Sequence, residues 1–383
     1  MSNRIAFLVG SGISFHAGMP KMQEITEHVL SGKGVSLKPG VLDFLKRLKM
    51  EVDQYYSKHS ERATSYEDLY YLASQISDSK LRMIENPAVQ AMIDKMDDDV
   101  KPPLSPALHG RSIPLKLEEL AAHTMEYIVG QVVRMLSSPP KSTSYLSAMV
   151  DCCKDPQVVQ VDIFTLNHDL ILESLLQENH IAFCDGFVPQ LDTIGDDKVL
   201  RKYNRELFQT TQCKVRLHKL HGSIDWFRYS PQGGNWHNEF IGNPRGDAPW
   251  AFRDEVGQPL LPIKTYEPRI LVGTINKMLS YSDGIYADLH WELDRALRKI
   301  WRLVVSGYGF GDTGINWRLI DWVFSSANWR MTIIGPTPDR FRKAAASIDT
   351  MWDQWLREGN VVLMRKAIED TTWEEIRDSL YST

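Results

Sequence analysis

Short apolar runs alternate with longer amphipathic segments along most of the chain. Ile5 to Val9 is an uninterrupted apolar run bounded by glycine, which is typical of a strand buried on both faces of a parallel sheet. Further strands are predicted at 158–165, 181–183, 215–220, 269–273, 301–306, 331–334 and 361–364. Helices are predicted between them at 22–30, 169–177, 286–300, 317–324 and 339–356. This alternation predicts an α/β fold, a doubly wound, mostly parallel Rossmann-like sheet.

Two stretches break the alternation. Residues 41–150 show mostly helical spacing of apolar positions, so we expect 36–150 to form a helical insertion subdomain. Residues 1–35 and 151–383 are then expected to form the Rossmann-like domain. A polar, proline-rich segment at 94–114 predicts an exposed loop, or alternatively a partner-binding arm. Residues 226–265 lack a clear period and predict long loops over one end of the sheet.

Composition narrows the class of protein. A net charge of −5 over 383 residues gives no general field for nucleic acid or an anionic membrane, although a local basic patch stays open. The four cysteines form no C-x-x-C pair, so we expect reduced thiols and no structural zinc site or other metal site. No cleavable apolar leader and no run of about 18 apolar residues is present, which predicts a cytoplasmic protein.

A glycine-rich turn follows the first predicted strand. Gly10, Ser11 and Gly12 allow main-chain N–H groups to approach a phosphate closely, and Ser14 is placed to open the next helix. The pattern is weak by itself, because many turns after a strand carry two glycines without binding anything.

Polar residues follow two later strands. Thr165, Asn167 and Asp169 lie at the end of a strand, where open α/β sheets bind ligands; the alternative is that Asn167 or Asp169 only caps the next helix. His221, beside Gly222 at a strand end, is the better candidate for a base, whereas His218 is expected to pack within the fold.

Two more glycine-rich turns follow the strands near the C-terminus. The loop from Ser306 through Gly307 to Asp312 is a second glycine-rich strand end, and two such loops suit a dinucleotide. Gly335, before Pro336, is a third, which fits the edge of an adenosine or a plain turn between strand and helix.

In this order the motifs resemble those of the sirtuin-like domains of bacterial antiphage defence. The motifs are G-S-G-I-S with G-M-P, T-L-N-H-D, C-D-G-F, K-L-H-G-S-I-D-W and G-Y-G-F-G-D. The resemblance implies that the first turn holds the pyrophosphate of NAD, through Gly10, Ser11, Gly12 and Ser14. It implies that Asn167 and Asp169, next to Thr165, border the nicotinamide ribose and that His221 is the general base. Ser306, Gly307, Asp312 and Gly335 would line the adenosine side.

Two departures point away from protein deacylation. The chain lacks the four zinc cysteines that follow the catalytic histidine of deacylating sirtuins, and Lys21-Met22-Gln23 stands where those enzymes have Asp-Phe-Arg. The expected activity is therefore NAD hydrolysis to nicotinamide and ADP-ribose, in a homo-oligomer with a possible hexameric HerA-type ATPase partner. The alternatives are a catalytically silent NAD- or nucleic-acid-binding scaffold, a nuclease subunit, and protein deacylation or ADP-ribosyl transfer.

Overall fold

The computed structural model describes residues 3–34, 37–60, 62–80, 87–99, 116–188, 198–210, 212–231, 239–245, 249–250, 252–254, 257–263 and 267–381. The chain divides into two compact units. Unit 1 comprises Met1–Met19, Ser138–Leu271 and Met278–Thr383, and unit 2 comprises Pro20–Ser137 and Val272–Lys277. No described helix combines the length and the apolar content needed to cross a membrane.

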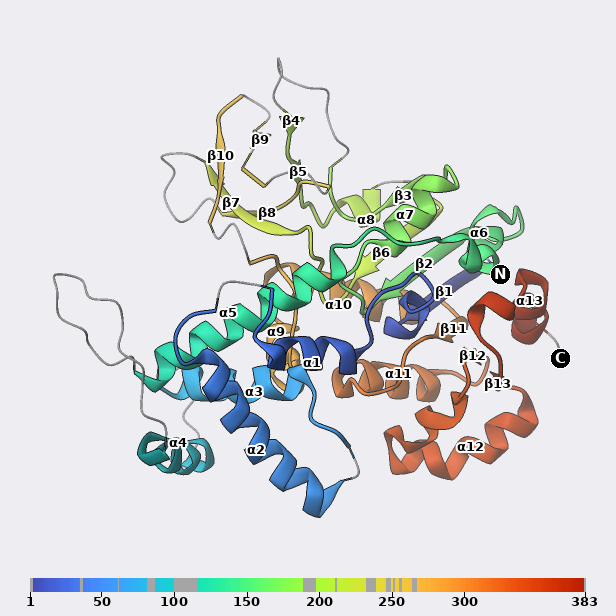
Figure 1. Ribbon diagram of the computed structural model, residues 1–383. Helices are drawn as coiled ribbons and strands as arrows, with labels where there is room; N and C mark the ends of the chain where they lie inside the picture. Colours follow the sequence, from blue (N-terminus) through green and yellow to red (C-terminus); the bar gives the residue numbers. More distant parts are fainter. Residues whose placement is uncertain are drawn as a thin grey trace. The chain divides into compact units, whose positions relative to one another are not determined.

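A seven-stranded sheet forms the centre of unit 1 (Figure 1). Its order is β13-β12-β11-β1-β2-β6-β3, and every neighbouring pair is parallel. The strands are β1 (Arg4–Val9), β2 (Gln160–Thr165), β3 (Phe183–Cys184), β6 (Val215–Lys219), β11 (Arg302–Ser306), β12 (Arg330–Ile334) and β13 (Val361–Met364). The predicted parallel α/β sheet is confirmed.

Helices pack on both faces of this sheet. Ala6 and Leu8 of β1 belong to one apolar core together with residues of α10 (Gly284–Leu297), α11 (Thr313–Ser325) and α12 (Ala346–Glu358). The alternate residue Phe7 lies outside that core and is also fully buried, as expected for a strand covered on both sides. Helix α13 (Trp373–Tyr381), which the sequence did not predict, contacts β11, β12 and α6 (Ser147–Lys154).

The strand order changes direction next to β1. The chain builds β2 on one side of β1 and only much later adds β11 on the other side, so the β1–β11 boundary is a topological switch point. At this boundary Val9 pairs with Ser306, and on the other side Val9 pairs with Thr165. Open α/β sheets bind ligands at the carboxyl ends of strands at such a point.

Residues 226–265 contribute strands to two smaller sheets, so the prediction of long loops was wrong. Four strands in the order β10-β7-β8-β5 pair antiparallel, and β4 (Lys198–Val199) pairs with β9 (Phe252–Arg253). The four are β5 (Arg201–Lys202), β7 (Phe227–Pro231), β8 (Phe240–Asn243) and β10 (Leu260–Pro262). Strands of two to five residues are too short to show a period.

Three other predicted elements differ from the structure. Residues 269–273 form no strand, and among them only Ile270 makes a bridge, with Gly222. The predicted helix 339–356 is divided at Ala345, whose extended backbone separates the 3-10 helix η5 (Pro338–Ala344) from α12. The predicted loop at 94–114 begins inside α4 (Pro87–Asp99), and its residues from 100 onward lie outside the described part of the chain.

Unit 2 is helical. Its helices are α1 (Met22–Ser31), α2 (Val41–His59), α3 (Tyr66–Lys80), α4 and α5 (Leu117–Leu136). Helix α5 contacts α1, α2 and α3, and the Tyr127 hydroxyl donates to the carbonyl oxygen of Val29 at 3.0 Å. Gly32 ends α1 in the left-handed conformation, with φ of 71°.

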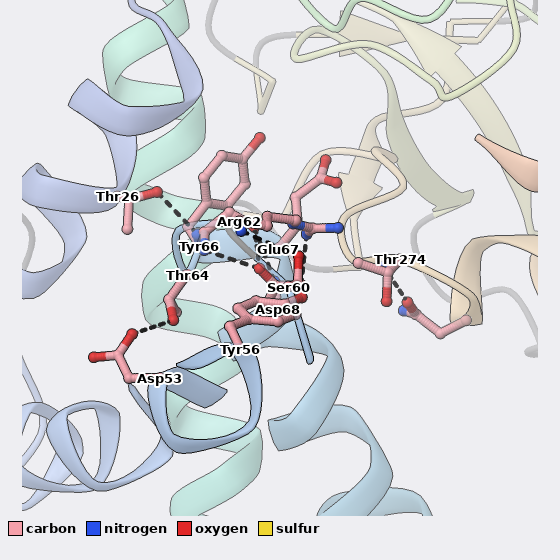
Figure 2. Close-up of polar contacts among 12 residues, drawn as sticks. Thr26, Asp53, Tyr56, Ser60, Arg62, Thr64, Tyr66, Glu67, Asp68 and Thr274 are labelled. Atoms are coloured by element: carbon pink, nitrogen blue, oxygen red, sulfur yellow. Dashed lines mark hydrogen bonds and ion pairs between the residues drawn. The ribbon is translucent and has the colours of Figure 1, made fainter. Parts of the chain in front are cut away.

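A polar cluster organises the start of α3 in unit 2 (Figure 2). The buried Asp68 carboxylate accepts from the Ser65 N–H at 2.9 Å and from Arg62 Nη2 at 2.7 Å. The Tyr56 hydroxyl of α2 donates to the same carboxylate at 3.0 Å. The Tyr66 N–H donates to Thr26 Oγ1 of α1 at 2.9 Å. The bonds from the Ser65 and Tyr66 N–H groups cap the start of α3, and those from Arg62 and Tyr56 hold the Asp68 carboxylate in place.

The two points at which the chain leaves and re-enters unit 1 lie next to each other. The Lys141 N–H donates to the carbonyl oxygen of Ala17 at 2.9 Å, and the Tyr145 hydroxyl donates to the carbonyl oxygen of Ile13. All four residues belong to unit 1. The long helical excursion therefore begins and ends at one place in the unit that carries the sheet.

Candidate functional site

The motif residues of unit 1 gather at the ends of four neighbouring strands. In the sheet order β11-β1-β2-β6, each strand leads directly into one predicted motif. Val9 is level with both Ser306 and Thr165, and Thr165 is level with Lys219. Motifs that lie up to 300 residues apart in the sequence therefore occupy one edge of the sheet.

The two glycine-rich loops pack main chain against main chain. The Gly10 N–H donates to the carbonyl oxygen of Ser306 at 3.1 Å, and the Gly12 N–H donates to that of Gly307 at 2.9 Å. A Cβ on Gly12 would lie 2.6 Å from Gly307 Cα, and a Cβ on Gly307 would lie 2.4 Å from the Ile13 nitrogen. Gly307 also has a φ of 65°. The glycines are therefore required for the loops to meet.

Ser14 joins the first motif to the second. The amide nitrogen of Asn167 donates to the carbonyl oxygen of Gly10 at 3.1 Å and to Ser14 Oγ at 3.0 Å. Ser14 Oγ in turn donates to Asp169 Oδ2 at 2.8 Å. All three side chains are buried. Because both donors are used in this way, the amide is oriented, and among the described residues none donates to its Oδ1.

The main chain around Asn167 is also fixed. The Asn167 N–H donates to Thr165 Oγ1 at 3.1 Å, and the Ile171 N–H donates to Asp169 Oδ1 at 3.2 Å, at the start of α7 (Ile171–Glu178). Asp169 therefore caps α7 with one oxygen and holds Ser14 with the other. The two interpretations of this residue, as a cap and as part of the site, are compatible.

A buried charged cluster lies behind the second motif. Lys219 Nζ donates to the carbonyl oxygen of Asp169 and to Glu173 Oε1, the latter at 2.8 Å. Burial raises the pKa of Glu173 to about 7, against the opposing effect of Lys219. Burial likewise raises the pKa of Asp225 above its usual range. Lys219 thus connects β6 to the loop that presents Asn167 and Asp169.

His221 is presented by a turn that only glycine can make. Gly222 has a φ of 81°, and a Cβ there would lie 1.9 Å from the carbonyl oxygen of Arg269. That segment holds the turn from the other side, because the Leu271 N–H donates to the carbonyl oxygen of His221 at 2.8 Å. The buried His221 side chain is therefore fixed to the end of β6 by its own backbone.

The ring of His221 meets a tyrosine and an aspartate. Nε2 lies 3.0 Å from the Tyr281 hydroxyl and 3.1 Å from Asp312 Oδ2. The Tyr281 hydroxyl also donates to Asp312 Oδ2, at 2.5 Å. Asp312, which the resemblance places on the adenosine side, thus contacts the predicted base.

The remaining predicted residues lie at the margin of this group. Ser11 is exposed in the short 3-10 helix η1 (Ser11–Ser14). Gly335 follows β12, one strand beyond β11, and its N–H donates to the carbonyl oxygen of Met364 at 3.1 Å. A Cβ at Gly335 would meet nothing within 4 Å, so its turn makes no steric demand for glycine.

His218 packs within the fold, as expected. Its ring is stacked between Phe164 and Phe208, with centroids 4.5 and 4.4 Å away, and its Nε2 lies 3.3 Å from Asp162 Oδ1. The C-D-G-F motif also has a structural role. Asp185 accepts two hydrogen bonds from Arg201, at 2.9 and 2.7 Å, in a buried ion pair.

Sequence reasoning missed Tyr281 and Glu173. Tyr281 follows α9 (Asn276–Ser280), outside every glycine-rich motif, and its partner His221 is 60 positions earlier in the chain. Glu173 lies inside a helix, and only its proximity to the strand residue Lys219 distinguishes it. Across the described ranges, no group of three or more His, Cys, Asp or Glu side chains is arranged for a metal ion.

Comparisons with known proteins give weak similarities. No family model and no curated protein matches the chain. Among solved structures, a Sir2 homologue bound to NAD matches at 12% identity and a TM-score of 0.37, over 99% of this chain and 90% of that one. Another solved structure, described as showing the structural basis for the mechanism and regulation of Sir2 enzymes, matches at 11% identity and a TM-score of 0.40. The match covers 99% of this chain and 93% of that one. These values are too low to locate any site in this chain.

Proposed function

We propose that unit 1 binds NAD and hydrolyses the bond between nicotinamide and ribose, releasing nicotinamide and ADP-ribose. The observation that supports this most is the Ser14–Asn167–Asp169 network at the end of β2, with His221 at the end of the neighbouring strand β6. It combines an oriented amide, a carboxylate and an imidazole at the ligand-binding edge of a parallel sheet.

The chemistry requires few groups. When the bond to nicotinamide breaks, positive charge develops on the anomeric carbon of the ribose and a neutral base leaves. The Oδ1 atom of Asn167 is suited to accept from a water molecule or a ribose hydroxyl. Asp169 holds Ser14, and through it Asn167, while its negative charge favours the developing cation. His221 takes the proton that the attacking water loses, so the products balance as nicotinamide, ADP-ribose and a proton.

The glycine loops contribute in a specific way to this proposal. The N–H groups of Gly10, Gly12 and Ile13 are already donated to protein oxygens. In the described part of the chain, nothing accepts from the N–H of the exposed Ser11. We therefore assign the phosphate contact of this turn to the Ser11 N–H and attribute the two glycines chiefly to the packing of the loops.

The expected biological role and partners come only from the resemblance of the sequence motifs. A role in antiphage defence by NAD depletion, homo-oligomerisation and a HerA-type ATPase partner are expectations from the sirtuin-like motifs. Direct binding of nucleic acid, the silent scaffold and the nuclease subunit are the competing expectations.

The test is nicotinamide release by the full chain, alone and with the protein encoded next to it. We expect His221→Ala and Asn167→Ala to lower the rate about 100-fold or more, because each removes a group that acts on the reacting atoms. The exposed residues His59 and Asn328 provide matched controls, His59→Ala and Asn328→Ala. NAD binding without turnover in both settings would favour the scaffold, and parental rates in both site variants would contradict the assignment.

A further inference from the structure

Two residues outside the reacting group converge on one nitrogen of His221. Nε2 faces both the Tyr281 hydroxyl, at 3.0 Å, and Asp312 Oδ2, at 3.1 Å. We propose that Asp312 and Tyr281 are positioning residues that fix the orientation and the tautomer of His221, so that Nδ1 is the basic nitrogen. This inference rests on the proposed function, in which His221 is the general base.

Asp312 is itself held firmly by the start of α11. Its Oδ1 accepts from the Ile315 N–H at 3.0 Å, as the cap of the helix. Its own N–H donates to the Tyr308 hydroxyl at 3.2 Å, and its carbonyl oxygen accepts from the Asn316 N–H at 2.9 Å. One oxygen is used by the helix, which leaves Oδ2 to His221 and Tyr281.

The charge of this carboxylate is retained despite burial. Burial alone would raise the pKa of Asp312, but hydrogen bonds from His221, Tyr281 and the Ile315 N–H hold it below its usual value. Burial, and next the charge of Asp312, raise the pKa of Tyr281, which therefore stays a phenol. An aspartate anion and a neutral tyrosine thus face the imidazole at neutral pH.

The direction of the hydrogen bonds follows from these charge states. The single hydroxyl proton of Tyr281 is donated to Asp312, so the tyrosine oxygen faces Nε2 as an acceptor. Both atoms that face Nε2 are then acceptors, and Nε2 must carry the proton. The proton from water is accordingly taken by Nδ1, and the imidazolium that forms has Asp312 as its counter-ion.

Three further titratable or charged groups near His221 and Tyr281, all in the described part of the chain, are not anions. They are His168, whose ring centroid lies 6.3 Å away, His290, which stacks on Tyr281 at 3.8 Å, and Arg318, which lies over Tyr281. Burial, followed by the charge of Arg318, lowers the pKa of His290, so that ring is neutral near pH 7. Arg318 pairs with Asp294 at 3.0 Å.

Asp312→Asn tests the proposal with little risk to the fold, since asparagine caps a helix as well as aspartate does. We expect kcat to fall about tenfold or more with NAD affinity nearly unchanged, because the base loses its counter-ion. The acid limb of the kcat/KM profile should move down by about one pH unit. Asp294→Asn, which removes a carboxylate from the same neighbourhood without touching His221, is the matched control.

Tyr281→Phe is a second variant, which should shift the acid limb of the pH profile in the opposite direction. It keeps the ring stacked on His290 but removes one donor from Asp312, so the carboxylate interacts more strongly with the imidazolium. We expect the acid limb to move up by a few tenths of a pH unit, with a several-fold lower kcat. A structural defect would move both variants in the same direction.

An activity-free readout separates this inference from the proposed function. The ring titration of His221 is followed by NMR and identified by the signal lost in His221→Ala. A midpoint that falls in Asp312→Asn and rises in Tyr281→Phe supports the proposal, even if the protein releases no nicotinamide. A midpoint that is unchanged in Asp312→Asn, or parental kcat and pH profile in that variant, overturns it.

Discussion

Gly12 and Gly307 are hydrogen-bonded to each other across the boundary between β1 and β11. The Gly12 N–H donates to the carbonyl oxygen of Gly307 at 2.9 Å, and neither residue has room for a Cβ. Glycine-rich turns of this kind suggest phosphate binding, because they let a ligand approach the backbone. In this protein the glycines first of all let the loop after β11 pack against the loop after β1.

Gly307→Ala is expected to destabilise unit 1 by more than about 2 kcal/mol. The residue has a φ of 65°, which L-residues adopt at a cost, and its Cβ would lie 2.4 Å from the Ile13 nitrogen. Urea denaturation followed by tryptophan fluorescence measures the effect. Gly311→Ala is the control, since a Cβ there meets nothing within 4 Å, and equal stability of the two variants would contradict the packing argument.

Gly222→Ala is expected to displace His221 and abolish nicotinamide release. The new methyl group would lie 1.9 Å from the carbonyl oxygen of Arg269, an atom of the main chain that accepts from the Ser223 N–H at 3.0 Å. The segment after β6 must therefore move. Hydrogen exchange of the Ser223 and Leu271 amides reports this directly, and parental protection of both would show that the turn tolerates alanine.

Ser14→Ala is expected to slow nicotinamide release about tenfold. It removes the hydroxyl that accepts from Asn167 and donates to Asp169, so the amide loses one of its two fixed contacts. Initial rates with saturating NAD measure the change. Ser31→Ala on α1 removes a comparable hydroxyl in unit 2 and should leave the rate unchanged. A parental rate in Ser14→Ala would remove the network from the mechanism.

The stability of unit 1 is expected to fall as pH rises from about 4.5 to about 7. Burial raises the pKa of Glu173 to about 7, so over this range the folded state keeps a proton that the unfolded state has lost. The free energy of unfolding falls by about 3 kcal/mol in total, and this fall is complete above pH 7. Lys219, Asp169 and Asp225 surround the group. Glu173→Gln cannot lose a proton, so its slope over this range should be flatter, and an unchanged slope would refute the assignment.

The positions of the eleven tryptophans make fluorescence a selective measure of the unfolding of unit 1. Each lies at or after Trp226, and those in the described part of the chain fall in segments of unit 1. Tryptophan fluorescence therefore follows the unfolding of the unit that carries the site, separately from unit 2.

The strands of the main sheet were predictable because their signal is local. Ile5–Val9 is apolar throughout, as is Leu303–Val305 within β11, and burial on both faces requires such runs. The motif residues that follow them could be recognised for the same reason, since each is adjacent in sequence to a strong strand. The order of the strands within the sheet could not be predicted, because no single apolar run specifies which strand it pairs with.

The contacts around His221 could not be predicted in this way. Tyr281 lies outside any strand-end motif, and Asp312 contacts His221 from the loop after β11, in which Phe310 has a φ of 54°. The small antiparallel sheet was missed for a related reason. Its core, which includes Leu200, Tyr229 and Phe252, is assembled from short segments far apart in the sequence.

The hydrogen bond between Lys141 and Ala17 has a consequence for how the protein tolerates insertions and deletions in Pro20–Ser137. Because the excursion Pro20–Ser137 leaves and re-enters unit 1 at adjacent points, folding the sheet closes one long loop, whose entropic cost grows only with the logarithm of its length. Residues added to or removed from the excursion thus change the closure entropy very little. The hydrogen bond between Lys141 and Ala17 can therefore form with an excursion of a different length.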